Sequence, residues 1–115
     1  MRITTMKGTN MQLTDAIKSR VESKSQLLAK LTKRFDPVAD LKVEVGKTTK
    51  RHSKGEYYRA EFQLSVPGKE LRAESVETDL YHAIDRACMQ VRRQLKGLKD
   101  KRQDAGKKKA RPGKE

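Results

Sequence analysis

The chain has 115 residues and a formal net charge of +13, which is enough for one small domain but too short for two independent cores. Residues 1–100 already carry 21 Lys and Arg against 13 Asp and Glu, so the charge does not come from the C-terminus alone. A cationic domain implies an anionic partner, either nucleic acid or an acidic membrane surface, while a charge that serves only solubility is the alternative.

The first predicted elements are a strand and a helix. β-branched residues predict a strand over 2–7, and residues 8–10 should form a turn. Thr14 should be the N-cap of a helix over 15–34. The helix ends before Pro37, which disfavours helical geometry in the preceding residue. Apolar residues recur at helical spacing along it: Ile17, Val21, Leu28, Leu31 and Phe35.

Three predicted strands follow, over 41–45, 58–66 and 71–74. Apolar and polar residues alternate in each, most regularly in the second. One face of the sheet should therefore be buried and the other should carry mixed charge, as in an antiparallel sheet with one solvated face. The basic connection over 47–56 should be mobile at its tip.

A second helix should begin after the N-cap Thr78. Its apolar seam is Tyr81, Ile84, Cys88, Val91, Leu95 and Leu98. After Arg102 no apolar periodicity remains, so 1–102 should form the domain and 103–115 a disordered basic tail. The predicted order is β-α-β-β-β-α, a two-layer α+β domain.

Catalysis has little support in the sequence. His52 and His82 lie in different elements without spaced Cys, Asp or Glu companions, and each is expected to be a surface histidine. Cys88 falls on the apolar seam and is most simply a core residue. No glycine-rich phosphate loop occurs, because the Gly46-Lys47-Thr48 triplet lacks the earlier glycine. We therefore expect no enzyme, no cofactor, no metal and no small-molecule substrate.

Partner and compartment are indicated by other features. No run of roughly 18 apolar residues exists, the N-terminus lacks the core of a signal peptide, and Cys88 has no disulfide partner. We expect a soluble, cytoplasmic protein without membrane contact. Only five aromatic residues occur, which favours phosphate contact with folded RNA over stacking on single strands.

The second helix carries the predicted contact surface. His82, Arg86, Met89, Arg93 and Lys96 form a stripe away from the apolar seam, and no acid lies between Arg86 and Lys99. A merely solvated face would intersperse acids, so we favour RNA contact. Arg92 lies at the rim of the stripe. On the first helix, Lys24 falls within the apolar stripe and should either snorkel or project into a groove between the helices.

Two motif series resemble a known family. The first helix contains Thr14-Asp15-Ala16-Ile17-Lys18, Val21-Glu22 with Lys24, and Arg34-Phe35-Asp36. The second series is Leu71-Arg72-Ala73-Glu74, Asp79-Leu80-Tyr81-His82-Ala83-Ile84-Asp85 and Arg93-Gln94-Leu95. Over residues 2–101 the chain resembles the ribosome hibernation promoting factor and ribosome-associated inhibitor family.

This resemblance implies a fold like that of double-stranded-RNA-binding domains, with both helices on one face of a four-stranded sheet. It also implies binding to small-subunit ribosomal RNA at the mRNA, A-site and P-site tRNA region, which would inhibit translation by idle ribosomes in stress. Five basic positions of the family pattern are matched by Lys18, Lys24, Arg93, Lys99 and Lys101. The stripe adds Arg86, Arg92 and Lys96 to the candidate rRNA-binding residues.

The chain departs from the family pattern in several places. Met89-Gln90 stands where Asp-Lys is common, and the C-terminal segment is basic where the inhibitor subgroup often has an acidic tail. Long members carry a second, dimerising domain, so we expect this chain to be a monomer off the ribosome that does not pair ribosomes by itself. Two alternatives stay open: a general double-stranded-RNA binder, and a protein-binding transcription modulator.

Overall fold

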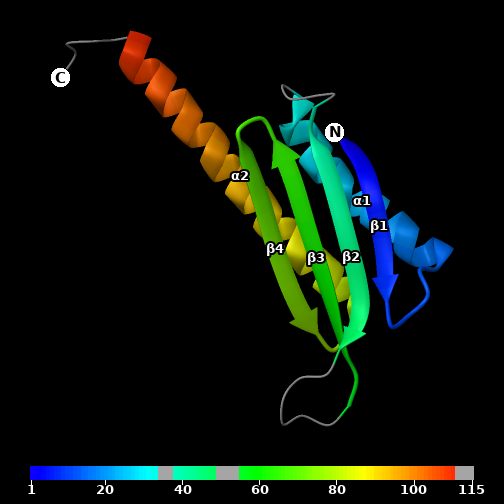
Figure 1. The fold of residues 1–115 in the computed structure, drawn as a ribbon. Coiled ribbons are helices and arrows are strands. Elements are labelled where there is room, and N and C mark those ends of the chain that lie inside the picture. The colour runs from blue at the N-terminus through cyan, green and yellow to red at the C-terminus, as the bar shows by residue number, and fades with distance from the viewer. Residues whose placement is uncertain (34–37, 49–54, 111–115) are drawn as a thin grey trace.

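Four strands form one sheet, and two helices cover a single face of it (Figure 1). The computed structural model describes residues 1–33, 38–48 and 55–110, and the side chains of all these except 103–110. The elements are β1 (Arg2–Thr9), α1 (Asp15–Leu31), β2 (Asp40–Thr48), β3 (Tyr57–Val66), β4 (Lys69–Glu77) and α2 (Leu80–Ala110). The predicted β-α-β-β-β-α order and the α+β class are confirmed.

The sheet has the order β1-β2-β3-β4, with β4 at one edge. β2 pairs with β3, and β3 with β4, in antiparallel fashion. The antiparallel arrangement expected of the three later strands is therefore confirmed, whereas β1 runs parallel to β2 and makes the sheet mixed. Along the chain, α1 connects these two strands and returns the backbone to the end of the sheet where β1 began, so both strands run in the same direction.

The core lies between the sheet and the helices, and period-two alternation identified its strand residues correctly. Phe62 and Leu64 of β3 are fully buried, as is Leu41 of β2. The apolar seam of α2 is buried from Ile84 to Leu95. Tyr81, which was assigned to that seam, is instead 37% exposed, and the neighbouring Leu80 takes its place in the core.

The structure corrects two of the helix boundaries that the sequence predicted. Thr14 does cap α1, since its Oγ1 accepts a hydrogen bond from the Ile17 amide at 3.2 Å. The N-cap of α2 is Asp79 rather than Thr78: the Asp79 carboxylate accepts from the Tyr81 amide at 3.3 Å, and its carbonyl accepts from the Ala83 amide at 3.0 Å. α1 ends at Leu31, before the predicted end at Arg34, and Arg34 itself lies outside the described part of the chain.

α2 is longer than the sequence predicted. Its backbone stays helical to Ala110, whereas ordered structure was expected to end at Arg102. Missing apolar periodicity shows only that a segment buries no face, and the Lys, Gln and Ala residues of 103–110 extend an existing helix readily despite Gly106. Thirty-one residues make α2 about 46 Å long, against about 30 Å for β4, so its end projects past the sheet (Figure 1). Residues 111–115 lie outside the described chain, and their expected disorder stays a prediction.

Candidate nucleic-acid interface

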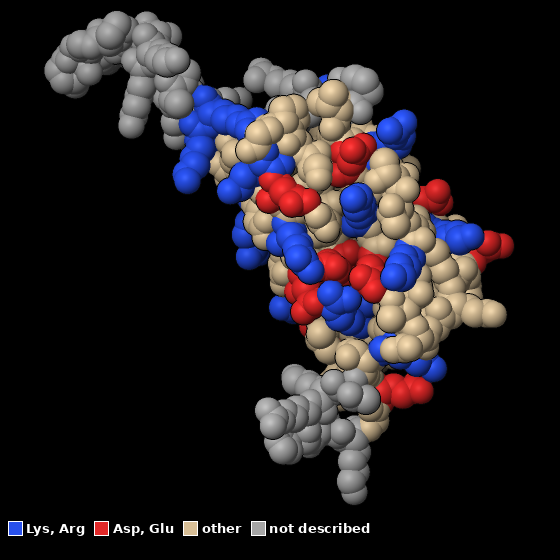
Figure 2. All heavy atoms as spheres, in the orientation of Figure 1, with Lys and Arg blue, Asp and Glu red and all other residues tan. Residues whose placement is uncertain are grey.

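The open face of the sheet is electrically balanced. The strand register places cations and carboxylates in equal number on the side away from the helices: Arg2, Lys7, Lys42, Arg59 and Arg72 with Asp40, Glu44, Glu61, Glu70 and Glu74. Figure 2 shows the two signs mixed over this face. A surface of this kind offers little net attraction to a polyanion.

Several of these charges are also paired with one another, centred on Arg59. Arg59 contacts Glu44 at 3.8 Å and Glu61 at 3.3 Å, and it donates a hydrogen bond to Glu74. A hydrogen bond from the Thr9 hydroxyl, 2.5 Å long, lowers the pKa of Glu44, and the positive charge of Arg59 lowers it further. The Glu44 carboxylate is thus held in its ionised form by the groups around it.

The exposed side of α2 differs in character. Met89, Arg92, Arg93 and Lys96 line a shallow hollow on it. Met89 is 58% exposed, and the three cations are exposed as well. Within the described part of the chain no carboxylate forms an ion pair with these three cations, so their charges are available to an external anion. The predicted stripe therefore contains a compact cationic site.

The contact between α1 and α2 holds a second arrangement of charge. Arg20 of α1 donates two hydrogen bonds to Asp85 of α2, from Nε at 3.2 Å and from a terminal nitrogen at 2.8 Å. The Arg20 guanidinium also lies 5.5 Å from the ring centre of Tyr81. Lys24 Nζ lies 3.9 Å from Asp85, so the Lys24 side chain reaches toward α2. Sequence reasoning missed Arg20, because spacing within one helix carries no signal for a partner on another.

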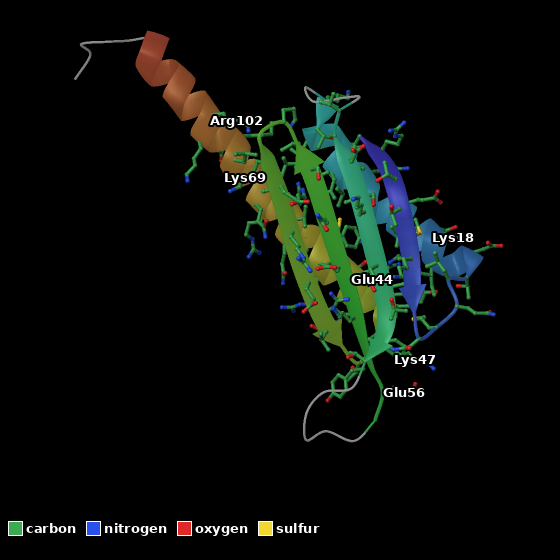
Figure 3. The ribbon with its side chains drawn as sticks, viewed as in Figure 1. Lys18, Glu44, Lys47, Glu56, Lys69 and Arg102 are labelled. Carbon is green, nitrogen blue, oxygen red and sulfur yellow. The ribbon has the colours of Figure 1, made fainter. Side chains whose placement is uncertain are left out.

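The eight predicted RNA-binding residues do not all converge. Arg92, Arg93 and Lys96 share the hollow, and Lys99 and Lys101 follow within the next turns of α2. Arg86 points instead toward the β4 side, where its Nε lies 3.3 Å from Glu77. Figure 3 places Lys18 beyond β1, at the opposite side of the domain from Lys69 and Arg102. Lys18 is thus exposed but separate from the α2 cluster.

No three His, Cys, Asp or Glu side chains of the described residues gather closely enough to hold a metal ion. His82 is exposed, Cys88 is buried, and His52 lies outside the described residues. In the described chain neither helix is both long and apolar enough to cross a membrane.

Comparison with known proteins gives consistent matches. The family described as sigma 54 modulation protein / S30EA ribosomal protein matches residues 4–103. A ribosome hibernation promotion factor of Deinococcus radiodurans is 34% identical over 99 residues, which cover 86% of this chain and 50% of that protein. The chain thus spans about half the length of that relative. A ribosome hibernation promoting factor of Acinetobacter guillouiae is 30% identical over 95 residues, which cover 79% of this chain and 81% of the relative.

Solved structures agree with this assignment. The N-terminal domain of Thermus thermophilus Protein Y superposes with a TM-score of 0.69 at 37% identity, covering 85% of this chain and 99% of that domain. A ribosomal subunit interface protein from Coxiella burnetii gives 0.65 at 17% identity, covering 87% and 99%, and supports the fold alone. The chain belongs to the sigma 54 modulation protein / S30EA ribosomal protein family.

Proposed function

We propose that this protein is a ribosome hibernation factor. It binds ribosomal RNA of the small subunit at the mRNA, A-site and P-site tRNA region, and it inhibits idle ribosomes by excluding those ligands. The observation that carries the proposal is the unpaired cationic hollow of Arg92, Arg93 and Lys96 on a domain of this family. The printed names of two relatives, both hibernation factors, support it.

The charge distribution supports one orientation on the RNA. Phosphate contacts supply most of the affinity of such proteins, so the face with free cations should meet the RNA. That face is the exposed side of α2 together with its border to α1, where Lys24 adds a further cation. The balanced sheet face would then point away from the RNA. In this arrangement the protein works as a monomer in the cytoplasm, where ribosomes are.

The eight sequence-derived residues have unequal roles in this proposal. Arg92, Arg93 and Lys96 form the central contact, and Lys99 and Lys101 extend it along α2. Arg86 contributes less, because Glu77 already neutralises part of its charge. Lys18 contacts the RNA only if the RNA also passes the α1 side of the domain.

Co-sedimentation with purified small subunits at about 0.1 M salt tests the proposal, because phosphate contacts still hold there. The protein should pellet with the subunits, and subunits loaded with mRNA and P-site tRNA should retain much less of it. Equal retention on loaded and empty subunits would contradict the steric mechanism. Displacement by an arbitrary RNA hairpin as effective as displacement by small subunits would instead support a general duplex-RNA binder.

A further inference from the structure

A groove runs between the C-terminal half of α2 and the edge strand β4. It is lined by Lys69, Leu71, Gln94, Gly97, Leu98 and Lys101. Leu71 is buried and Leu98 half-buried, while both lysines are exposed. The groove therefore has an apolar floor and a cationic rim, and none of its lining residues is acidic. Figure 3 shows Lys69 at the start of β4, beside α2.

Gly97 is unusual in this groove. Glycine is the least favourable residue in a helix interior after proline, and Gly97 lies well inside α2. A Cβ added at Gly97 would meet no heavy atom within 4 Å. Neither packing inside the domain nor a positive φ therefore requires a glycine there. Close approach of an external backbone is the remaining physical reason for a residue without a side chain.

The charges around Gly97 indicate what approaches it. Arg93 and Lys101 lie four residues before and after it, on the same ridge of α2. Lys69 faces this ridge across the groove. Cations thus surround a position that has open space above it, as the phosphates of a polyanion require.

A peptide strand is a poorer fit to the same groove. To extend the sheet, a strand would need the free backbone groups of β4. The Arg72 carbonyl at this edge already accepts a hydrogen bond from Gln94 Nε2 at 3.0 Å. Arg102 likewise donates to the Pro67 carbonyl at 2.9 Å. Side chains of α2 therefore already occupy a carbonyl of β4 and one of the turn before it, while the lysines of the rim stay exposed.

We propose that an RNA sugar–phosphate backbone lies in this groove and passes directly over Gly97. Its phosphates contact Lys69 and Lys101, and a ribose packs on Leu71 and Leu98. The inference rests on the proposed ribosome binding and adds four contact residues to it: Lys69, Leu71, Gly97 and Leu98. It also extends the RNA surface from the hollow on α2 to the edge of the sheet.

Filling the space over Gly97 tests the inference. Gly97→Ala should raise Tm by about 4 °C or more, because alanine is the better helix former. The same change should weaken binding to small subunits several-fold, and the larger Gly97→Gln should weaken it at least tenfold. Ser23→Gln, a neutral enlargement on the exposed side of α1, is the matched control and should leave the Kd unchanged. A more stable protein that binds more weakly cannot be explained by misfolding.

Removing the charge of Lys69 tests the chemical nature of the occupant. Lys69→Gln should lower the slope of log K against log salt by about 0.7–0.9, the loss of one phosphate contact. Lys42→Gln on the balanced sheet face removes the same charge and should leave the slope unchanged. If the Gly97 variants weaken binding but Lys69→Gln does not change the slope, a ribosomal protein occupies the groove and the RNA assignment is wrong.

The proposed function and the groove fail in different ways. Wild-type affinity in both Gly97 variants would overturn the groove while leaving ribosome binding intact. No binding of the wild-type protein to small subunits would overturn the proposed function, and the groove with it.

Discussion

Neutralising two cations of the hollow on α2 should weaken ribosome binding in a salt-dependent way. The variant combines Arg93→Gln with Lys96→Gln, two exposed side chains that line the hollow. Neither forms an ion pair with another described residue, so the fold should tolerate the change. We expect Tm to shift by less than about 4 °C.

The size of the effect follows from counterion release. Each phosphate contact contributes about 0.7–0.9 to the slope of log K against log salt, so two contacts contribute about 1.4–1.8. Between about 0.05 and 0.2 M salt, a fourfold change, the wild-type affinity should therefore fall roughly 7- to 12-fold more than that of the variant.

Titration of labelled protein with small subunits at four salt concentrations measures both slopes. The matched control combines Arg2→Gln with Lys42→Gln, which removes one Arg and one Lys from the balanced face of the sheet. This control has the same net charge and should keep the wild-type slope. Equal loss of slope in both double variants would refute the reasoning, because affinity would then depend on net charge and not on the exposed side of α2.

Three further results are expected. Gly46→Ala should destabilise the domain by about 1–3 kcal/mol in urea unfolding, because the new Cβ would lie 2.5 Å from the Thr9 carbonyl oxygen. Unchanged stability would contradict this close approach of β1 and β2. Asp85→Asn should lower Tm, since Arg20 loses its charged acceptor. It should also tighten RNA binding, because it removes a negative charge from the face of the domain that carries the helices. A lower Tm together with weaker RNA binding would contradict this expectation. Burial raises the pKa of Cys88 to about 11 from 9.0, so its thiol ionises first in the unfolded chain. Stability should be unaffected below about pH 9 and fall by roughly 2–3 kcal/mol toward pH 11, a loss that Cys88→Ala should reduce in alkaline unfolding.

Much of the fold could be predicted from local pattern. Alternation in β3 identified Phe62 and Leu64 as core residues because successive strand side chains point to opposite faces. The 3-4 spacing in α2 found Ile84, Cys88 and Leu95 for the corresponding reason in a helix. The run without acids after Arg86 indicated the exposed cationic side of α2. Which residues share that side follows from helix geometry alone.

The sequence by itself determined the order of the elements and most of their buried faces, because periodicity is a local property. Only the tertiary structure decided which elements meet. It made β1 parallel to β2, bound Arg20 to Asp85 and Arg86 to Glu77, and separated Lys18 from the α2 cluster. The tertiary structure also placed Lys69 of β4 across the groove from Gly97. Contacts between distant segments depend on packing of the whole core, and no spacing within one element encodes them.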